Sequence, residues 1–219
     1  MNKFLGVLLM AVLAVCAFVY TSHAASAPWT EDFGIDKADL VPTGSNPYFI
    51  LEPGHQLYFK GKKGDLTITV LDETKTINGV ETRVVEERET EDGTVSEVSR
   101  NYFAISKTNN SVFYFGEDQG GAWHAGENGA KAGLIMPGLV LLGGRHYQEI
   151  APKVAMDRAE IVSMSETLQV PAGKFDNVLK IEETTPLEPF SKEYKYYARG
   201  IGLLRDGDME LVRYGFVKK

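Results

Sequence analysis

Two histidine and glutamate pairs are the first residues in this chain whose types could do chemistry. His124 precedes Glu127 and His146 precedes Glu149, each with two residues between the partners. This spacing puts both side chains on one face only in a helix, whereas on a strand they point in opposite directions. If the glycine-rich segment between the histidines folds back, they could meet a carboxylate and form a zinc site. The alternative is that all four are rim or turn residues.

The other catalytic patterns are sparse. Asp206-Gly207-Asp208 could supply oxygen ligands to calcium, but Asp-Gly is also a routine hairpin turn, and we favour the turn. The sequence has no Gly-x-Ser-x-Gly nucleophile elbow, and its single cysteine, Cys16, lies in the N-terminal apolar segment. Covalent catalysis therefore has no candidate residue, and no cofactor is expected. Hydrolysis by two carboxylates stays open, because such acids come from distant positions in a sequence.

Aromatic and apolar residues form a second candidate site, for binding rather than for catalysis. On a strand, Tyr194 and Tyr196 share one face and Tyr197 takes the other. The segment from Trp123 to Leu141 could form a flap over an apolar cleft that holds a lipid tail or another hydrophobic ligand. Ordinary core packing is the alternative, and it is the one we favour for these residues taken alone. The candidate ligand-binding residues are Trp123, Met136, Leu139, Leu141, Tyr194, Tyr196 and Tyr197.

The elements that must position these residues have the two-residue period of strands. Leu66, Ile68 and Val70 alternate with threonines, and the dipeptides Asn78-Gly79 and Asp92-Gly93 suit two-residue hairpin turns. Alternating runs and turn signals along the chain predict about nine to eleven strands and no long helix. The charged run 86–89 is interpreted as the solvated face of an antiparallel sheet.

An antiparallel sheet with one wet face must cover its apolar face. Residues 116–144 are rich in glycine and leucine and are predicted to be an irregular flap over that face. Gly200 and Gly202 flank Ile201 inside a strand pattern, which favours a bulge or sharp bend. The sequence therefore predicts an all-β fold with a strongly curved antiparallel sheet, either a half-barrel or an open barrel.

The N-terminus has the pattern of a secretory signal peptide over residues 1–24. Lys3 precedes an apolar run over residues 4–20, and small residues at Ser22 and Ala24 suit cleavage after Ala24. Residues 25–219 are predicted to be one exported domain, periplasmic or extracellular; a retained N-terminal anchor is the alternative. The net charge is −7, and loss of Lys3 makes it −8. This charge disfavours nucleic acid and leaves at most transient contact with an anionic membrane.

Two segments carry a resemblance to known proteins. Residues 171–175 (PAGKF) and 196–203 (YYARGIGL) resemble a signature of exported bacterial β-proteins of unknown function. The pattern is similar to families with the curved antiparallel half-barrel of the periplasmic lipoprotein carriers. With residues 46–49 (NPYF) and 183–189 (ETTPLEP), nearly all of the mature chain resembles one uncharacterised secreted family, although Arg199 stands where proline is usual. The resemblance implies a half-barrel with an apolar concave face and brings no catalytic residues.

These observations leave three functional hypotheses. We favour a non-catalytic exported binding module that holds a lipid, another hydrophobic ligand or an envelope protein on its concave face. The second hypothesis is a secreted hydrolase that uses carboxylates, or a metal held by histidines and carboxylates. The third is an envelope assembly or structural factor that recruits partners through an exposed strand edge.

Overall fold

The computed structural model describes residues 28–119 and 121–217, and these form an all-β protein, as the sequence predicts. Their one helical element is a 3₁₀ turn, η1 (Lys37–Asp39), capped by the Asp36 side chain, which accepts a hydrogen bond from the Ala38 N–H. No helix in the described ranges has the length and apolar character needed to cross a membrane. The predicted signal peptide, residues 1–24, lies outside the described residues.

Seventeen strands follow one another within residues 28–119 and 121–217. In the first half they are β1 (Leu40–Val41), β2 (Gly44–Asn46), β3 (Phe49–Leu51), β4 (His55–Lys60), β5 (Gly64–Ile77), β6 (Val80–Glu91), β7 (Thr94–Ser106) and β8 (Val112–Asp118). In the second half they are β9 (Trp123–His124), β10 (Lys131–Met136), β11 (Arg145–Tyr147), β12 (Glu149–Ile150), β13 (Arg158–Val170), β14 (Gly173–Thr185), β15 (Glu188–Ala198), β16 (Gly202–Asp206) and β17 (Met209–Phe216).

Tight turns with positive φ values join the long strands. Asn78 and Gly79 connect β5 to β6 with φ of 50° and 78°, and Asp92 and Gly93 connect β6 to β7 with φ of 50° and 76°. Both positions of a type I′ turn need positive φ, which asparagine, aspartate and glycine adopt at little cost. The two predicted hairpins are therefore confirmed. Gly207, with φ of 54°, lies in the turn between β16 and β17.

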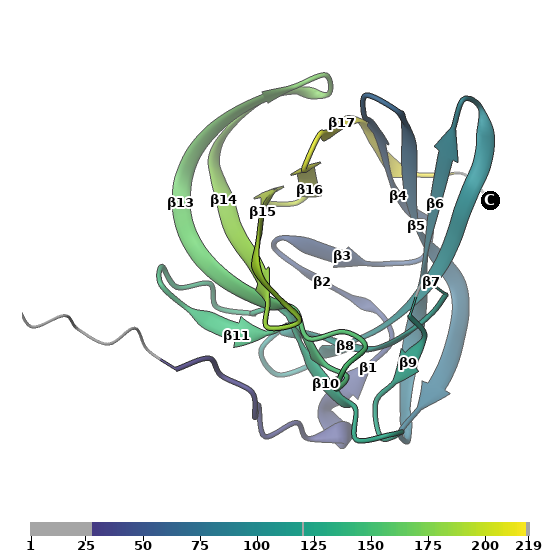
Figure 1. Cartoon of the computed structure of the whole chain (residues 1–219), viewed down its shortest axis with the longest axis vertical. Helices are drawn as coiled ribbons and strands as arrows, with labels where there is room; N and C mark the ends of the chain where they lie inside the picture. The colour runs from purple at the N-terminus through teal and green to yellow at the C-terminus, as the bar shows by residue number, and fades with distance from the viewer. Residues whose placement is uncertain (1–27, 120, 218–219) are drawn as a thin grey trace, which may run out of the picture.

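Fifteen of these strands form one antiparallel sheet that curls almost into a closed barrel (Figure 1). Thirteen strands follow one path, in the order β11-β13-β14-β15-β16-β17-β4-β5-β6-β7-β8-β10-β12, with β1 and β9 paired to its side. The predicted strong curvature is confirmed. The predicted count of about nine to eleven strands is too low. β10 lies inside the segment predicted to be irregular, and β11 and β12 are two short adjacent strands that periodicity does not separate. The sheet also closes further than a half-barrel.

The two ends of this path meet in one short stretch of chain, residues 145–150. Its first half, β11, pairs with β13, and its second half, β12, pairs with β10. The free edge of β11 is occupied by Thr30, which exchanges hydrogen bonds with the main chain of Arg145 (3.1 Å) and Tyr147 (2.9 Å). The neighbouring Trp29 ring lies under the guanidinium groups of Arg145 and Arg158, at 4.1 and 4.7 Å. We call this stretch the seam.

Residues 116–144 are less irregular than the sequence suggests. The segment contains β9 and β10, and β10 pairs with both β8 and β12, so it forms part of the barrel wall rather than a flap. Gly133 lets β10 pack closely against the backbone of Gln148. Any larger residue would clash there, because its Cβ atom would lie 2.3 Å from the Gln148 carbonyl oxygen. Glycines in this region therefore serve close backbone packing as well as turns.

A separate hairpin, β2 and β3, crosses the space that the strands enclose (Figure 1). Asn46, fully buried, donates from its side-chain nitrogen to the carbonyl oxygens of Asn110 and Pro137, both at 2.9 Å. At the hairpin tip, the Pro47 carbonyl accepts a hydrogen bond from the Gly200 N–H (2.7 Å). These bonds tie the tip of the hairpin to the β7–β8 turn, to the end of β10 and to the β15–β16 turn, and we call the hairpin the plug.

Candidate functional site in the barrel interior

An apolar cavity lies inside the barrel, next to the plug. Successive residues of a strand face opposite sides, so the alternation that predicts β5 also sends one set of its side chains inward. The cavity has a volume of about 140 Å³, and Tyr48, Phe49 and Ile50 of the plug form part of its wall. The barrel contributes Leu57, Leu66, Ile68, Val70, Ile201 and Leu203. An apolar cavity of this kind is a suitable place for a hydrocarbon group.

A second cavity of about 230 Å³ adjoins the first and is lined mainly by polar groups. The polar residues in its wall are Asn101, Glu117, Gln148, Glu149, Asp157 and Glu183. Glu87, Phe103, Ile135 and Lys195 line both cavities, so these two spaces are neighbours across a shared wall. We call the first space the apolar cavity and the second the acidic chamber.

Lys195 is the central charge of this shared wall. Its ammonium group lies 2.8 Å from a Glu183 oxygen and 3.5 Å from an Asp206 oxygen. Burial opposes the charged form of Lys195, but the two carboxylates outweigh it, so its pKa is raised well above the ordinary value. Gln148 supports Glu183 by donating a side-chain hydrogen bond of 2.8 Å to it.

Two interior carboxyl groups hold their protons to unusually high pH. Burial raises the pKa of Glu87 to about 7; the Lys195 charge opposes this shift, and neighbouring carboxylates add to it. Burial and the neighbouring Asp157 raise the pKa of Glu149 to about 8. Glu149 also accepts a hydrogen bond of 2.7 Å from the Asp157 main-chain N–H. Groups with strongly perturbed pKa values inside a cavity are typical of functional sites.

Aromatic rings form one wall of the acidic chamber. The ring of Tyr114 stacks on Phe103, with centroids 4.7 Å apart and an interplanar angle of 20°, and meets the edge of Trp123 at 5.1 Å and 80°. The Tyr114 hydroxyl donates to Asn101 (2.5 Å) and lies 3.2 Å from Glu117. Burial and nearby carboxylates raise the pKa of Tyr114 well above its ordinary value, so this hydroxyl stays protonated.

The candidate ligand-binding residues are distributed over three different environments. Tyr197 lines the apolar cavity, whereas Tyr194 and Tyr196 lie beside the Lys180 ammonium group on another face of β15. Trp123 is buried against the acidic chamber.

The remaining flap candidates, Met136, Leu139 and Leu141, also lie in different environments. Met136 is fully buried in the core, but Leu139 and Leu141 are 75% and 61% exposed. The two exposed leucines do not line the apolar cavity. The structure therefore does not place these residues together as one cover.

The candidate metal ligands are also dispersed. His124 lies 2.8 Å from Asp118 and 3.8 Å from Glu127. His146 is buried in β11, and this burial lowers its pKa to about 4. Across residues 28–119 and 121–217, no group of three or more His, Cys, Asp or Glu side chains is arranged to hold a metal ion.

His124 belongs instead to a polar cluster that ties β9 to β5, β7 and β8. Asp118 accepts hydrogen bonds from Tyr102 and from Lys75 (3.0 Å), and contacts His124. Burial alone would raise the pKa of Asp118, but the hydrogen bonds from Tyr102, Lys75 and His124 outweigh it and lower the pKa. The cluster stabilises the short strand β9 on the barrel.

The interior charges were missed by the sequence interpretation. Glu87 was assigned to a solvated face with its charged neighbours, but it follows Val85 by two residues and shares the inward side of β6. The two-residue spacing from the apolar Val85 was the sequence signal that could have placed Glu87 inside the barrel. Asp206 likewise points to Lys195, and Asp208 accepts a hydrogen bond of 3.0 Å from the Lys62 N–H, which makes 206–208 a hydrogen-bonded turn.

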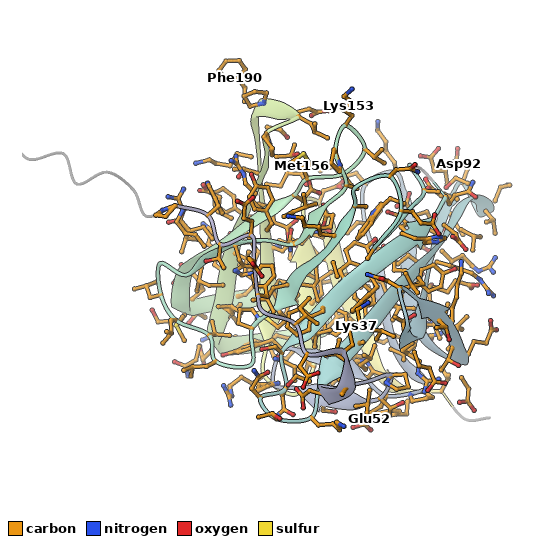
Figure 2. The ribbon with its side chains drawn as sticks, turned by 90° about the horizontal axis from the view of Figure 1, so that it is seen from below. Lys37, Glu52, Asp92, Lys153, Met156 and Phe190 are labelled. Carbon is orange, nitrogen blue, oxygen red and sulfur yellow. The ribbon has the colours of Figure 1, made fainter. Side chains whose placement is uncertain are left out.

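Two exposed segments border the acidic chamber. Ala155 and Asp157 line it from the loop before β13, and the Thr185 hydroxyl at the end of β14 donates to the Met156 carbonyl of that loop (3.4 Å). Figure 2 shows Phe190 projecting at the same edge of the molecule as Lys153 and Met156. Phe190 is fully exposed, so an apolar side chain stands free close to the polar end of the interior.

Comparisons of the chain with models of protein families, with curated proteins and with solved structures found no match.

Proposed function

We propose that the chain is an exported, non-catalytic binding module that holds a hydrophobic or amphiphilic ligand inside its barrel. The observation that carries this proposal is the apolar cavity, which is lined by the barrel wall and the plug and shares four lining residues with the acidic chamber. A ligand with a hydrocarbon part and a polar end matches both spaces. The resemblance to half-barrel lipoprotein carriers and the signal-like residues 1–24 support the same proposal.

The proposed site differs from the one expected at first. It lies between the plug and the barrel wall, and it uses Tyr197 from the original set, with Ile68 and Leu203 among the new residues. The apolar surface of the interior favours the ligand through the hydrophobic effect, at about 25 cal/mol for each Å² removed from water. The polar end then determines which amphiphile fits.

The first test fills the apolar cavity with a larger side chain. Ile68→Trp places an indole into the space, and Thr67→Trp adds the same bulk to the opposite face of β5 as a matched control. Binding of an environment-sensitive apolar dye would be measured by fluorescence titration, with circular dichroism to confirm folding. We expect Ile68→Trp to weaken dye binding by about tenfold or more and Thr67→Trp to leave it unchanged. Equal binding by both variants would contradict an interior site.

A second test looks for the natural ligand. Native mass spectrometry of the protein purified from its own envelope fraction, followed by denaturation, would identify any molecule that the barrel retains. We expect an apolar or amphiphilic compound that Ile68→Trp fails to retain. Recovery of the protein without such a compound, together with failure to bind the dye, would refute the proposal.

Hydrolysis through carboxylates is a second candidate function, and one observation favours it. Glu87 and Glu149, with pKa values of about 7 and 8, hold protons at neutral pH, as the general acid of a hydrolase must. The same mass-spectrometric experiment separates the two functions. A binding module returns its ligand intact after prolonged incubation, whereas a hydrolase returns cleaved products whose formation stops in Glu87→Gln or Glu149→Gln.

A further inference from the structure

The two interior spaces contain far more negative than positive groups. Their walls include six carboxyl groups, Glu87, Glu117, Glu149, Asp157, Glu183 and Asp206. Lys195 is the single lysine or arginine among the lining residues. His55, which also lines the apolar cavity, does not correct this imbalance, because burial lowers its pKa and favours the neutral ring.

Lys195 neutralises only part of this set. It pairs with Glu183 and Asp206, and no lysine, arginine or histidine of the described chain lies within ion-pair distance of Glu87, Glu117, Glu149 or Asp157. Glu87 has neither a hydrogen-bond nor an ion-pair partner for its carboxyl group among the described residues, although it lies in the wall shared by both spaces. A buried carboxylate without a partner is costly, so the interior favours an added positive charge.

The aromatic wall points to the same chemistry. Phe103, Tyr114 and Trp123 line the chamber beside the carboxyl groups, and aromatic faces attract cations, most strongly where water is excluded. Trp123 is only 6% exposed, and its indole N–H has no hydrogen-bond partner within the described residues. This donor needs an acceptor atom, which an ammonium group cannot supply, so the N–H indicates a further polar atom of the ligand or a water molecule in the chamber.

We propose that the ligand of this barrel carries an ammonium group, which lies among the carboxyl groups and aromatic rings of the acidic chamber while its hydrocarbon part fills the apolar cavity. This inference rests on the proposed binding function and adds the chemical class of the ligand. Anionic lipids and fatty acids would meet carboxylates at this end of the site, and electrostatic repulsion disfavours them.

Protons occupy the site when the cation is absent. The groups that face Glu87 and Glu149 from the surrounding elements are Glu117 and Tyr114 of β8, Asp157 before β13, Glu183 of β14, Lys195 and Tyr197 of β15, and Asp206 of β16. An arriving ammonium group stabilises the ionised carboxyl groups and displaces their protons into solution. Cation binding should therefore release protons near neutral pH and strengthen as the pH rises.

The test compares three amphiphiles that share one hydrocarbon chain: decyltrimethylammonium, decanol and decyl sulfate. The two charged compounds keep their charge at every pH used, so any pH dependence of their binding comes from the protein. Isothermal titration calorimetry would be run at about pH 5.5 and about pH 8.5, below and above the raised pKa values of the interior carboxyl groups. Repeating the titrations in buffers of different ionisation enthalpy gives the number of protons released.

We expect the ammonium compound to bind at least about tenfold tighter than decanol at the higher pH, with a smaller preference at the lower pH. Decyl sulfate should bind more weakly than decanol. Glu87→Gln should lower the affinity for the ammonium compound relative to that for decanol, and it should reduce proton release. Glu91→Gln, at the exposed end of β6, removes the same charge outside the cavities and should change neither quantity.

Different outcomes overturn the two proposals. Equal binding of all three amphiphiles, a preference for decyl sulfate, or an ammonium affinity that is independent of pH and of Glu87 would overturn the cationic ligand and leave the binding function intact. Failure of all three compounds to bind the interior would overturn the proposed function, and the cationic ligand with it.

Discussion

Replacing Glu149 by glutamine should make the protein more stable, and the gain should grow with pH. Glu149 is 4% exposed, and its folded-state pKa of about 8 lies far above the ordinary glutamate value of 4.5. The folded chain therefore binds a proton that the unfolded chain has lost at intermediate pH. Under this condition stability falls as pH rises, between about pH 4.5 and about pH 8. Glutamine has a similar shape and remains neutral, so it removes this cost.

The two pKa values set the size of the effect. At about 1.4 kcal/mol for each tenfold change in proton affinity, they correspond to a ceiling of about 5 kcal/mol above pH 8. Asp157, whose pKa is also raised by burial, titrates in the same chamber and shares this cost, so we expect a gain of about 2 to 3 kcal/mol at about pH 8.5. At about pH 5 the gain should be about 1 kcal/mol or less, because most of the cost has not yet developed.

Urea unfolding followed by tryptophan fluorescence at three pH values would measure this difference. The matched control is Glu91→Gln, which removes one carboxylate from an exposed position. In this control variant the unfolding free energy, relative to the natural protein, should not increase with pH. The reasoning is refuted if Glu149→Gln is less stable than the natural protein at about pH 8.5, or if the difference in unfolding free energy is the same at every pH.

Three further variants test other parts of the structure. Asp118→Asn removes the charged partner of His124 and Lys75 in a partly exposed cluster and should lower the unfolding free energy by about 1 kcal/mol in urea titrations; an unchanged value would show that the cluster adds nothing to stability. Asn46→Ala removes both side-chain hydrogen bonds that anchor the plug and should cost about 2 to 4 kcal/mol; thermal unfolding would measure it, and a near-neutral result would mean that other contacts anchor the plug. Leu139→Asp alters a side chain that is 75% exposed and should change stability by less than about 0.5 kcal/mol and leave dye binding unchanged; loss of dye binding alone would restore the predicted flap.

Much of the barrel could be predicted from local sequence. Asn78-Gly79 and Asp92-Gly93 determine two hairpins through positive φ values, and the predicted alternation of Leu66, Ile68 and Val70 lies within β5. Such features depend on neighbours in the chain, where turn chemistry and the strand period act directly.

The interior site could not be predicted in the same way. Glu87, Glu149 and Lys195 come from strands far apart in the sequence, and only closure of the barrel brings them together. A run of charged residues usually lies on the solvated face of a sheet, and this expectation led to the wrong placement of Glu87, which faces inward. Leu139 shows the opposite error, since a leucine-rich loop suggested a cover but its side chain is exposed.

Closure at the seam has a consequence for the order of folding. The wall joins β4 to β17, which lies about 150 residues later, and the seam depends on Thr30 meeting residues 145–147. Contacts between such distant parts carry a large loop-closure cost, so we expect the hairpins of β5 to β7 and of β13 to β15 to form first, within microseconds, and the ring to close much later. Until the last strand arrives, β4 is an open edge that can pair with another chain. A barrel of this design is therefore most vulnerable to aggregation while β17 is still missing.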